Sequence, residues 1–162
     1  MILFNTSQGD FTVELFNDAA PISSENFLAY VDAGFFDGTI FHRVISGFMI
    51  QGGGFTEDMK QKSGHDPIKN EAKNGKKNLR GTLSMARTND INSATSQFFI
   101  NLVDKDFLDN KAGSYGYAVF GQVTSGMEVI DAIAKVKTGR SGHHEDVPVE
   151  AVIVHKVTRT DK

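Results

Sequence analysis

The feature of this chain that most constrains its fold is the alternation of apolar and polar residues in short stretches separated by turns. Phe11, Val13 and Leu15 alternate with polar residues, and Ile2 and Phe4 are spaced two apart on the other side of the polar segment 7–10. A period of two places the apolar side chains on one face of a strand. The start of the chain therefore predicts a β-hairpin whose turn lies at 7–10.

Six further segments have the composition of strands, each bounded by glycine or by polar residues. They are 40–45, 48–51, 81–86, 96–101, 118–123 and 147–157. The 13 phenylalanines and 16 glycines among the 162 residues fit many short strands and tight turns. About eight strands in one chain favour a mainly β protein folded as a closed barrel, because closure removes the unpaired edges of a sheet.

Two segments have the periodicity of helices instead. Pro21 suits the first turn of a helix, and a rough apolar stripe follows it until Gly34. Further on, residues 125–128 match a capping box, with Ser125 at the N-cap and Glu128 three positions later. Apolar residues then recur at helical spacing. We therefore expect two helices beside the strands.

The longest polar stretch, residues 52–78, is rich in glycine, lysine and asparagine and predicts a surface loop. Its basic part, which continues to residue 80, can be read as a nucleic-acid patch. No aromatic residues interleave with the lysines there, and the net charge of the chain is −3. A solvated loop is therefore the favoured interpretation, and we expect no nucleic-acid partner.

Other features of the sequence bear on the compartment. The chain has no cysteine, so disulfides, a thiolate nucleophile and thiolate-held metals are excluded. Its first residues lack the regions of a signal peptide, and no stretch comes near the run of about 18 apolar residues that a membrane span needs. We therefore expect a soluble, unexported protein of the cytoplasm with no membrane partner.

The predicted strand 96–100 carries one unusual face. Its period of two places Phe98 and Ile100 on one side. Gln97 and Phe99 then share the other side, which is half polar and half aromatic. An outward sheet face more often carries lysine, glutamate, threonine or serine.

The predicted strand 48–51 repeats this pattern. Phe48 and Ile50 are expected to point one way, and Met49 and Gln51 the other. Exposed apolar surface beside placed polar groups is what a ligand groove looks like. The residues alone also fit a tolerated amphipathic surface, and both interpretations stay open.

The remaining candidates for chemistry are weak. Arg43 fits a surface salt bridge as well as a site, and His42 has no serine or aspartate partner that would make a triad. The histidines and carboxylates at 143–146 lack the spacing of a helical zinc site, so no metal is expected. The glycines 52–54 are not followed by the lysine of a phosphate loop. The chain thus points to binding, or to a reaction without proton transfer or a covalent intermediate.

Longer motifs carry a family resemblance. Residues 36–53, FDGTIFHRVISGFMIQGG, resemble the signature of the cyclophilins, which are peptidyl-prolyl cis-trans isomerases. Residues 85–87 followed by 96–100 resemble the second active-site segment of that family, and 107–109 and 119–121 match further on. The resemblance covers nearly the whole chain and is strongest to the short cytoplasmic cyclophilins of bacteria.

The resemblance implies a closed eight-stranded antiparallel barrel capped by two helices, in a single domain over residues 1–162. It implies catalysis of rotation about X-Pro bonds in proline-containing peptides and in unfolded or folding proteins, without a cofactor. A monomer is the default expectation. Arg43 is the implied catalytic residue. The implied substrate-binding residues are Phe48, Met49, Gln51, Ala86, Arg87, Gln97, Phe99, Phe107, Leu108 and Tyr117.

Two departures from the family pattern modify these expectations. Many cyclophilins have tryptophan in place of Phe107, and its indole N–H contributes to cyclosporin binding; phenylalanine cannot donate, so weakened affinity for cyclosporin A is expected. The family often has histidine near Tyr117, and residues 110–116 resemble an insertion before it. A non-catalytic proline-peptide binding module and a chaperone-like barrel are the alternative functions.

Overall fold

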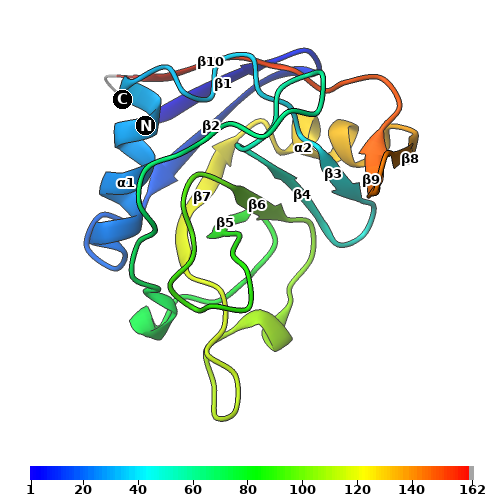
Figure 1. Cartoon of the computed structure of the whole chain (residues 1–162). Helices are drawn as coiled ribbons and strands as arrows, with labels where there is room; N and C mark the ends of the chain where they lie inside the picture. Colours follow the sequence, from blue (N-terminus) through cyan, green and yellow to red (C-terminus); the bar gives the residue numbers. More distant parts are fainter. Residues whose placement is uncertain (161–162) are drawn as a thin grey trace.

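The computed structural model describes residues 1–160, so the last two residues of the predicted domain 1–162 lie outside the described part. An eight-stranded antiparallel sheet dominates the structure (Figure 1). In chain order its strands are β1 (Ile2–Thr6), β2 (Gly9–Leu15), β3 (Arg43–Ile45), β4 (Met49–Gly52), β5 (Thr82–Met85), β6 (Phe98–Asn101), β7 (Val119–Ser125) and β10 (Val154–Arg159). Their order across the sheet is β10-β1-β2-β7-β5-β6-β4-β3. The prediction of a mainly β fold with an eight-stranded antiparallel sheet is confirmed.

The two edges of the sheet meet through an isolated bridge. Ile40 bridges Ile153, and the Phe41 N–H donates to the Val152 carbonyl at 3.1 Å. These contacts lie before β3 and before β10, so no ladder joins the two strands. The term closed is therefore slightly overstated for this barrel. The closure is partial because the strand predicted over 147–157 is interrupted between Pro148 and Val154.

Part of that predicted strand belongs to a separate hairpin. The strands β8 (Thr138–Ser141) and β9 (His144–Pro148) pair only with each other, and the sequence interpretation missed this two-stranded sheet. His144 is the first residue of β9. Among residues 1–160, no group of three or more histidine, aspartate or glutamate side chains is placed to hold a metal ion.

The helix α1 (Pro21–Asp32) begins with Pro21 in its first turn, as predicted. It buries Phe27, Tyr30 and Val31 against the sheet, so its packing on the barrel is what stabilises it. The chain turns at Gly34, where φ is 69°. No helix of residues 1–160 is both long enough and apolar enough to cross a bilayer.

The second helix, α2 (Met127–Ala134), buries Ile130 and Ile133. The predicted capping box is wrong. The N-cap is Gly126 with φ at 89°, and no side chain caps the helix. Ser125 is instead the last residue of β7, where its hydroxyl lies 2.8 Å from that of Thr12 on β2. Ser125 therefore pairs with the neighbouring strand, whereas the local pattern predicts that it caps the helix.

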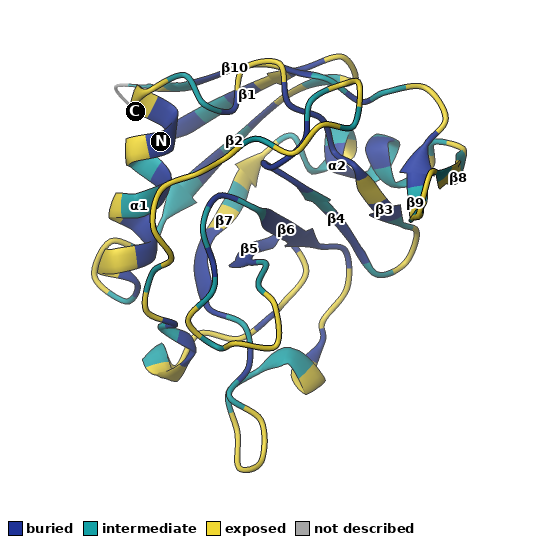
Figure 2. Cartoon of the chain, viewed as in Figure 1, coloured by how far each residue is buried: buried dark blue, intermediate teal, exposed yellow. Residues whose placement is uncertain are grey.

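The core lies within the curved sheet and includes buried residues of both helices. Figure 2 shows the buried segments in dark blue. Phenylalanine rings fill the core, and those of Phe4 and Phe11 stack across the first hairpin with centroids 4.6 Å apart. Phe27 of α1 meets Phe98 of β6 edge to face at 5.5 Å. Ile50 of β4 and Ile100 of β6 are also buried here. The side chains that alternate with them therefore point to the opposite face of the sheet, outside the core.

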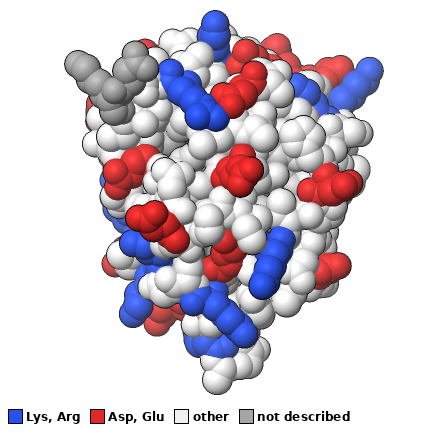
Figure 3. All heavy atoms as spheres, turned by 90° about the vertical axis from the view of Figure 1, so that its left-hand side faces the viewer, with Lys and Arg blue, Asp and Glu red and all other residues white. Residues whose placement is uncertain are grey.

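The polar segment after β4 is a loop, as predicted, with isolated bridges and one 3-10 helix, η1 (Ala72–Asn74). It is nevertheless anchored. Asn78 is 1% exposed, and its side-chain amide donates to the Asp109 carboxylate at 3.0 Å. A second 3-10 helix, η2 (Asp106–Leu108), follows β6. On the face that carries α1, cationic and anionic side chains both spread over the surface (Figure 3).

Candidate active site

Strand register places three side chains in a row on the face opposite the core. Arg43 of β3 pairs with Gln51 of β4, and Gln51 pairs with Phe99 of β6. Residues that pair directly across strands point to the same side of a sheet. Ile50 and Ile100 also pair with each other and point into the core. Arg43, Gln51 and Phe99 therefore share the outer face.

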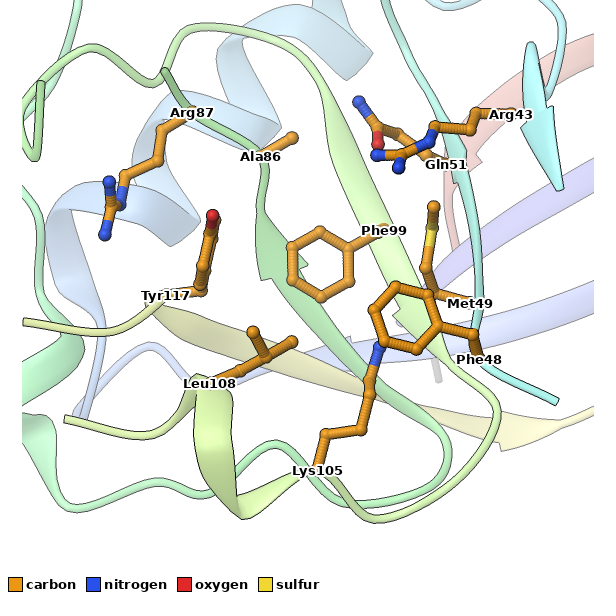
Figure 4. Close-up of a pocket in the computed structure, with 10 residues that line it drawn as sticks. All are labelled: Arg43, Phe48, Met49, Gln51, Ala86, Arg87, Phe99, Lys105, Leu108 and Tyr117. Atoms are coloured by element: carbon orange, nitrogen blue, oxygen red, sulfur yellow. The ribbon is translucent and has the colours of Figure 1, made fainter. Parts of the chain in front are cut away.

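A cavity of about 290 Å³ opens at this row. Figure 4 shows the side chains that line it. Its walls combine aromatic and aliphatic side chains with two arginines, a lysine and a glutamine. The lining residues are Arg43, Phe48, Met49, Gln51, Ala86, Arg87, Phe99, Lys105, Leu108 and Tyr117. The structure thus brings together every predicted site residue except Gln97 and Phe107, which lie beside the cavity. Lys105 is a lining residue that the sequence interpretation missed.

The prediction from strand alternation that Phe48 points to the same side as Ile50 is wrong, since Ile50 lies in the core and Phe48 lines the cavity. β4 begins only at Met49, and Phe48 belongs to the preceding turn, where its N–H donates to the Ile45 carbonyl at 3.0 Å. Gly47 has φ at 74° and breaks the extended backbone. Strict alternation holds only inside a strand, so Phe48 and Met49 both reach the cavity.

Gln97 acts on the cavity through Gln51. The Gln51 amide donates a hydrogen bond of 3.0 Å from Nε2 to Oε1 of Gln97. The Gln97 side chain lies across Gly54, where an added Cβ would come within 2.5 Å of its Cγ. Gly54 therefore has to lack a side chain so that Gln97 can pack closely against the backbone.

The two arginines of the cavity differ in their engagement. Arg87 donates from Nε and Nη2 to the Gly116 carbonyl at 3.3 and 3.0 Å, and its guanidinium lies 4.5 Å from the ring centroid of Tyr117. The Arg43 side chain is exposed, and within residues 1–160 its guanidinium makes no hydrogen bond or ion pair. Arg87 therefore forms a wall, whereas Arg43 is available to a ligand.

Aromatic rings supply the rest of the walls. Phe99 is 6% exposed and meets Tyr117 edge to face, with centroids 5.6 Å apart. Phe107 stacks on Phe48 at 6.2 Å but is 54% exposed, so it flanks the cavity and does not line it. Leu108, one residue further along η2, does line it.

Lys105 lies beneath the aromatic wall. It is 2% exposed, and its Nζ sits 3.8 Å from the ring centroid of Phe48 and 5.2 Å from that of Phe99. Burial, followed by the charge of Arg43, lowers the pKa of Lys105 to about 8. Between Asp104 and Asp106 in a polar turn, Lys105 carries no signal of burial in the sequence.

His42 lies next to the arginine but outside this cavity, as expected for a structural residue. It is 5% exposed, and its ring packs against that of Phe55 with centroids 4.4 Å apart. Burial lowers the pKa of His42 to about 4, with smaller effects from His144 and Arg43. The imidazole is therefore neutral near pH 7.

Solved structures share this architecture. The cyclophilin-type isomerase of Cryptosporidium parvum, crystallised in the presence of the dipeptide Ala-Pro, has a TM-score of 0.80 and 27% identity, over 99% of each chain. Cyclophilin AquaCyp293 from Hirschia baltica has a TM-score of 0.77 over 97% of this chain and 72% of its own. The sheet, the helices and their order thus define a cyclophilin-type barrel.

The sequence comparisons place the chain within a family. Residues 1–159 match the family model for cyclophilin type peptidyl-prolyl cis-trans isomerases. The chain is 57% identical to peptidyl-prolyl cis-trans isomerase B of Escherichia coli K12 over 98% of both chains. It is 59% identical to isomerase cyp18 of Streptomyces antibioticus over 93% of this chain and 92% of the other. The chain therefore belongs to the cyclophilin family and is a peptidyl-prolyl cis-trans isomerase, which confirms the resemblance.

Proposed function

We propose that the cavity at β3, β4 and β6 is where this isomerase binds and twists the X-Pro bond, with Arg43 as its catalytic residue. The observation that carries this proposal is that Arg43, at the rim of a cavity with aromatic and aliphatic walls, has no hydrogen-bond or ion-pair partner within residues 1–160. The bond resists rotation by about 18–20 kcal/mol because of amide resonance. No bond is made or broken in the reaction, so the enzyme must bind the twisted amide more tightly than either planar form.

Arg43 suits the twisted state. When resonance is lost, the proline nitrogen becomes pyramidal and regains its lone pair, and a guanidinium can donate to that nitrogen or to the proline carbonyl. Arginine remains protonated at every relevant pH and presents several donors in one plane, which lysine cannot do. The apolar walls strengthen this interaction by excluding water.

The other lining residues divide into two groups in this proposal. Phe48, Met49, Phe99 and Leu108 surround the proline ring, and Tyr117 borders them. Gln51 contacts the substrate backbone and is held by Gln97. Ala86 and Arg87, with Gln97, border the groove for the residues before proline. Phe107 extends the aromatic surface beyond Phe48.

Single substitutions test the role of Arg43. We expect Arg43→Ala to lower kcat/KM on a proline tetrapeptide by about 10² to 10³ in a protease-coupled assay, as for loss of one donor to developing charge. Arg43→Lys should recover only part of this rate. Arg140→Ala is the matched control, since Arg140 is an exposed arginine outside the cavity whose Nε donates to the Gly142 carbonyl. Equal rates for wild type and Arg43→Ala would refute the catalytic assignment.

We further propose that the chain is one isomerase domain over residues 1–162, that it acts as a monomer on unfolded or folding proteins, and that it works in the cytoplasm. The lack of cysteine suits a reducing compartment. Light scattering, refolding of a protein limited by a slow proline step, and cell fractionation test these three points.

A further inference from the structure

Lys105 is the cavity residue that the proposed mechanism does not use. Its side chain is 2% exposed, and its ammonium lies over the rings of Phe48 and Phe99. Figure 4 shows it reaching toward Phe48 from the side of the cavity opposite Arg43. The cavity thus has a cationic group on each side of its apolar centre.

The charge of Lys105 faces aromatic rings but no anion within residues 1–160. Its Nζ has no hydrogen-bond partner, and it takes part in none of the three ion pairs found within residues 1–160. The neighbouring carboxylates do not neutralise it, since Asp104 accepts from the Arg80 N–H at 2.9 Å and Asp106 is exposed. A buried ammonium without a partner is unfavourable because it has lost its hydration. A ligand that places an anion near it would relieve this penalty.

The rest of the lining reinforces the positive field. Three of the ten lining residues are cationic and none is aspartate or glutamate. Arg87 is bonded to backbone carbonyls, which leaves Arg43 and Lys105 as the unpaired charges. In surroundings of low dielectric, charges several ångströms apart attract each other far more strongly than in water. Direct contact with Nζ is therefore not required for an anion to be favoured.

We propose that Lys105 is a specificity-determining residue that makes this isomerase prefer peptides with a carboxylate next to the proline. The carboxylate comes either from an acidic side chain adjoining the proline or from the C-terminus of a chain that ends in proline. This inference rests on the proposed binding of the proline ring in the cavity.

Three matched peptide pairs test the proposal, with kcat/KM measured by NMR exchange spectroscopy, which needs no protease. The pairs carry Glu or Gln before the proline, Glu or Gln after it, and a free or an amidated C-terminal proline. We expect wild type to prefer the charged member of at least one pair by about tenfold, and that pair identifies the source of the carboxylate. Lys105→Met should abolish the preference. A purely structural role would lower both members of a pair equally and leave their ratio unchanged.

Lys76→Met is the matched control. Lys76 also places its Nζ over a phenylalanine ring, 4.4 Å from the centroid of Phe16, but it is exposed and lies outside the cavity. This variant should keep the wild-type preference. Loss of the preference in Lys76→Met as well would show that general surface charge causes it and would overturn the role of Lys105.

A pH series on wild type gives a test that does not depend on the folding of a variant. Because burial lowers the pKa of Lys105 to about 8, the preference should decline between about pH 7 and pH 9. The charged and titratable groups near Lys105 include Arg43, Arg87 and Tyr117 of the cavity, the flanking Asp104 and Asp106, and Asp109, which binds Asn78. The same series on Lys105→Met shows how much these groups contribute.

Three outcomes would overturn the inference: no preference for any charged peptide, a preference that survives in Lys105→Met, or a wild-type preference that does not change with pH. Failure of the proposed function looks different. In that case Arg43→Ala would keep the wild-type rate on neutral peptides, whatever the charge preference.

Discussion

The side-chain amide of Gln51 donates a 3.0 Å hydrogen bond to the side-chain carbonyl of Gln97, and this bond ties β4 to the segment before β6 beside Arg43. The pair lies at the edge of the cavity, and only Gln51 lines it. Gln97 therefore acts through its neighbour, as a positioning residue.

Removal of the Gln97 side chain should lower activity more than stability. We expect Gln97→Ala to reduce kcat/KM about five- to tenfold, the effect of one hydrogen bond that positions Gln51. In a double-mutant cycle with Gln51→Ala the two losses should not add, because both remove the same contact. The control is Gln122→Ala. Gln122 on β7 is an exposed glutamine whose amide bonds to Glu14 on β2, and kcat/KM of this variant should stay within about twofold of wild type. Additive losses would contradict the coupling.

Cyclosporin binding should depend on the residue at position 107. Phe107 is 54% exposed and stacks on Phe48, but its ring has no hydrogen-bond donor. We expect Phe107→Trp to lower the concentration of cyclosporin A that halves isomerase activity by about tenfold, since tryptophan adds an N–H. Phe107→Leu, which removes the ring without adding a donor, is the control. Equal inhibition of wild type and Phe107→Trp would count against this explanation.

Gly121 should tolerate no side chain, although its φ is ordinary. A Cβ at this position would lie 2.6 Å from the backbone oxygen of Glu14 on the neighbouring strand β2. We expect Gly121→Ala to lower the free energy of unfolding by about 1–3 kcal/mol, because two paired strands must separate locally. Gly139→Ala in β8 is the control, since the atom nearest its Cβ is at 3.7 Å. Urea unfolding of both variants tests this, and equal midpoints would refute it.

His42 should make the stability depend on pH in the acidic range. Burial lowers its pKa from 6.5 to about 4, so between these values the unfolded chain binds a proton that the folded chain does not. The free energy of unfolding is therefore at its full value above about pH 6.5 and declines as pH falls toward 4, by up to about 3 kcal/mol.

The measurement for His42 is urea unfolding at pH 7 and pH 4.5. Wild type should lose more stability over this interval than His42→Gln, which cannot titrate. His155→Gln removes an exposed histidine and should follow wild type. An identical loss in wild type and His42→Gln would exclude this histidine as the cause.

Much of the site was predictable because it depends on local pattern. Alternation in the segment 96–100 placed Phe99 opposite Phe98 and Ile100, and the structure has Phe99 at the cavity and the other two in the core. The first hairpin and the helix that starts at Pro21 were predictable for the same reason. Where a strand began later than expected, the rule failed, and Phe48 faces the cavity instead of the side that Ile50 shares.

The sequence by itself determined the family, most of the strands and helices, and the polar and apolar faces of most strands, because these depend on residues close together in the chain. Only the tertiary structure decided which strands pair and what surrounds each side chain. Strand pairing aligns Arg43, Gln51 and Phe99 on one face. It also places Ser125 beside Thr12 of β2 and not at the predicted helix cap. Lys105 is buried against Phe99, which precedes it closely in the chain, and against Phe48, which is distant in sequence. Burial and charge environment are properties of residues that meet through folding, and no local pattern contains them.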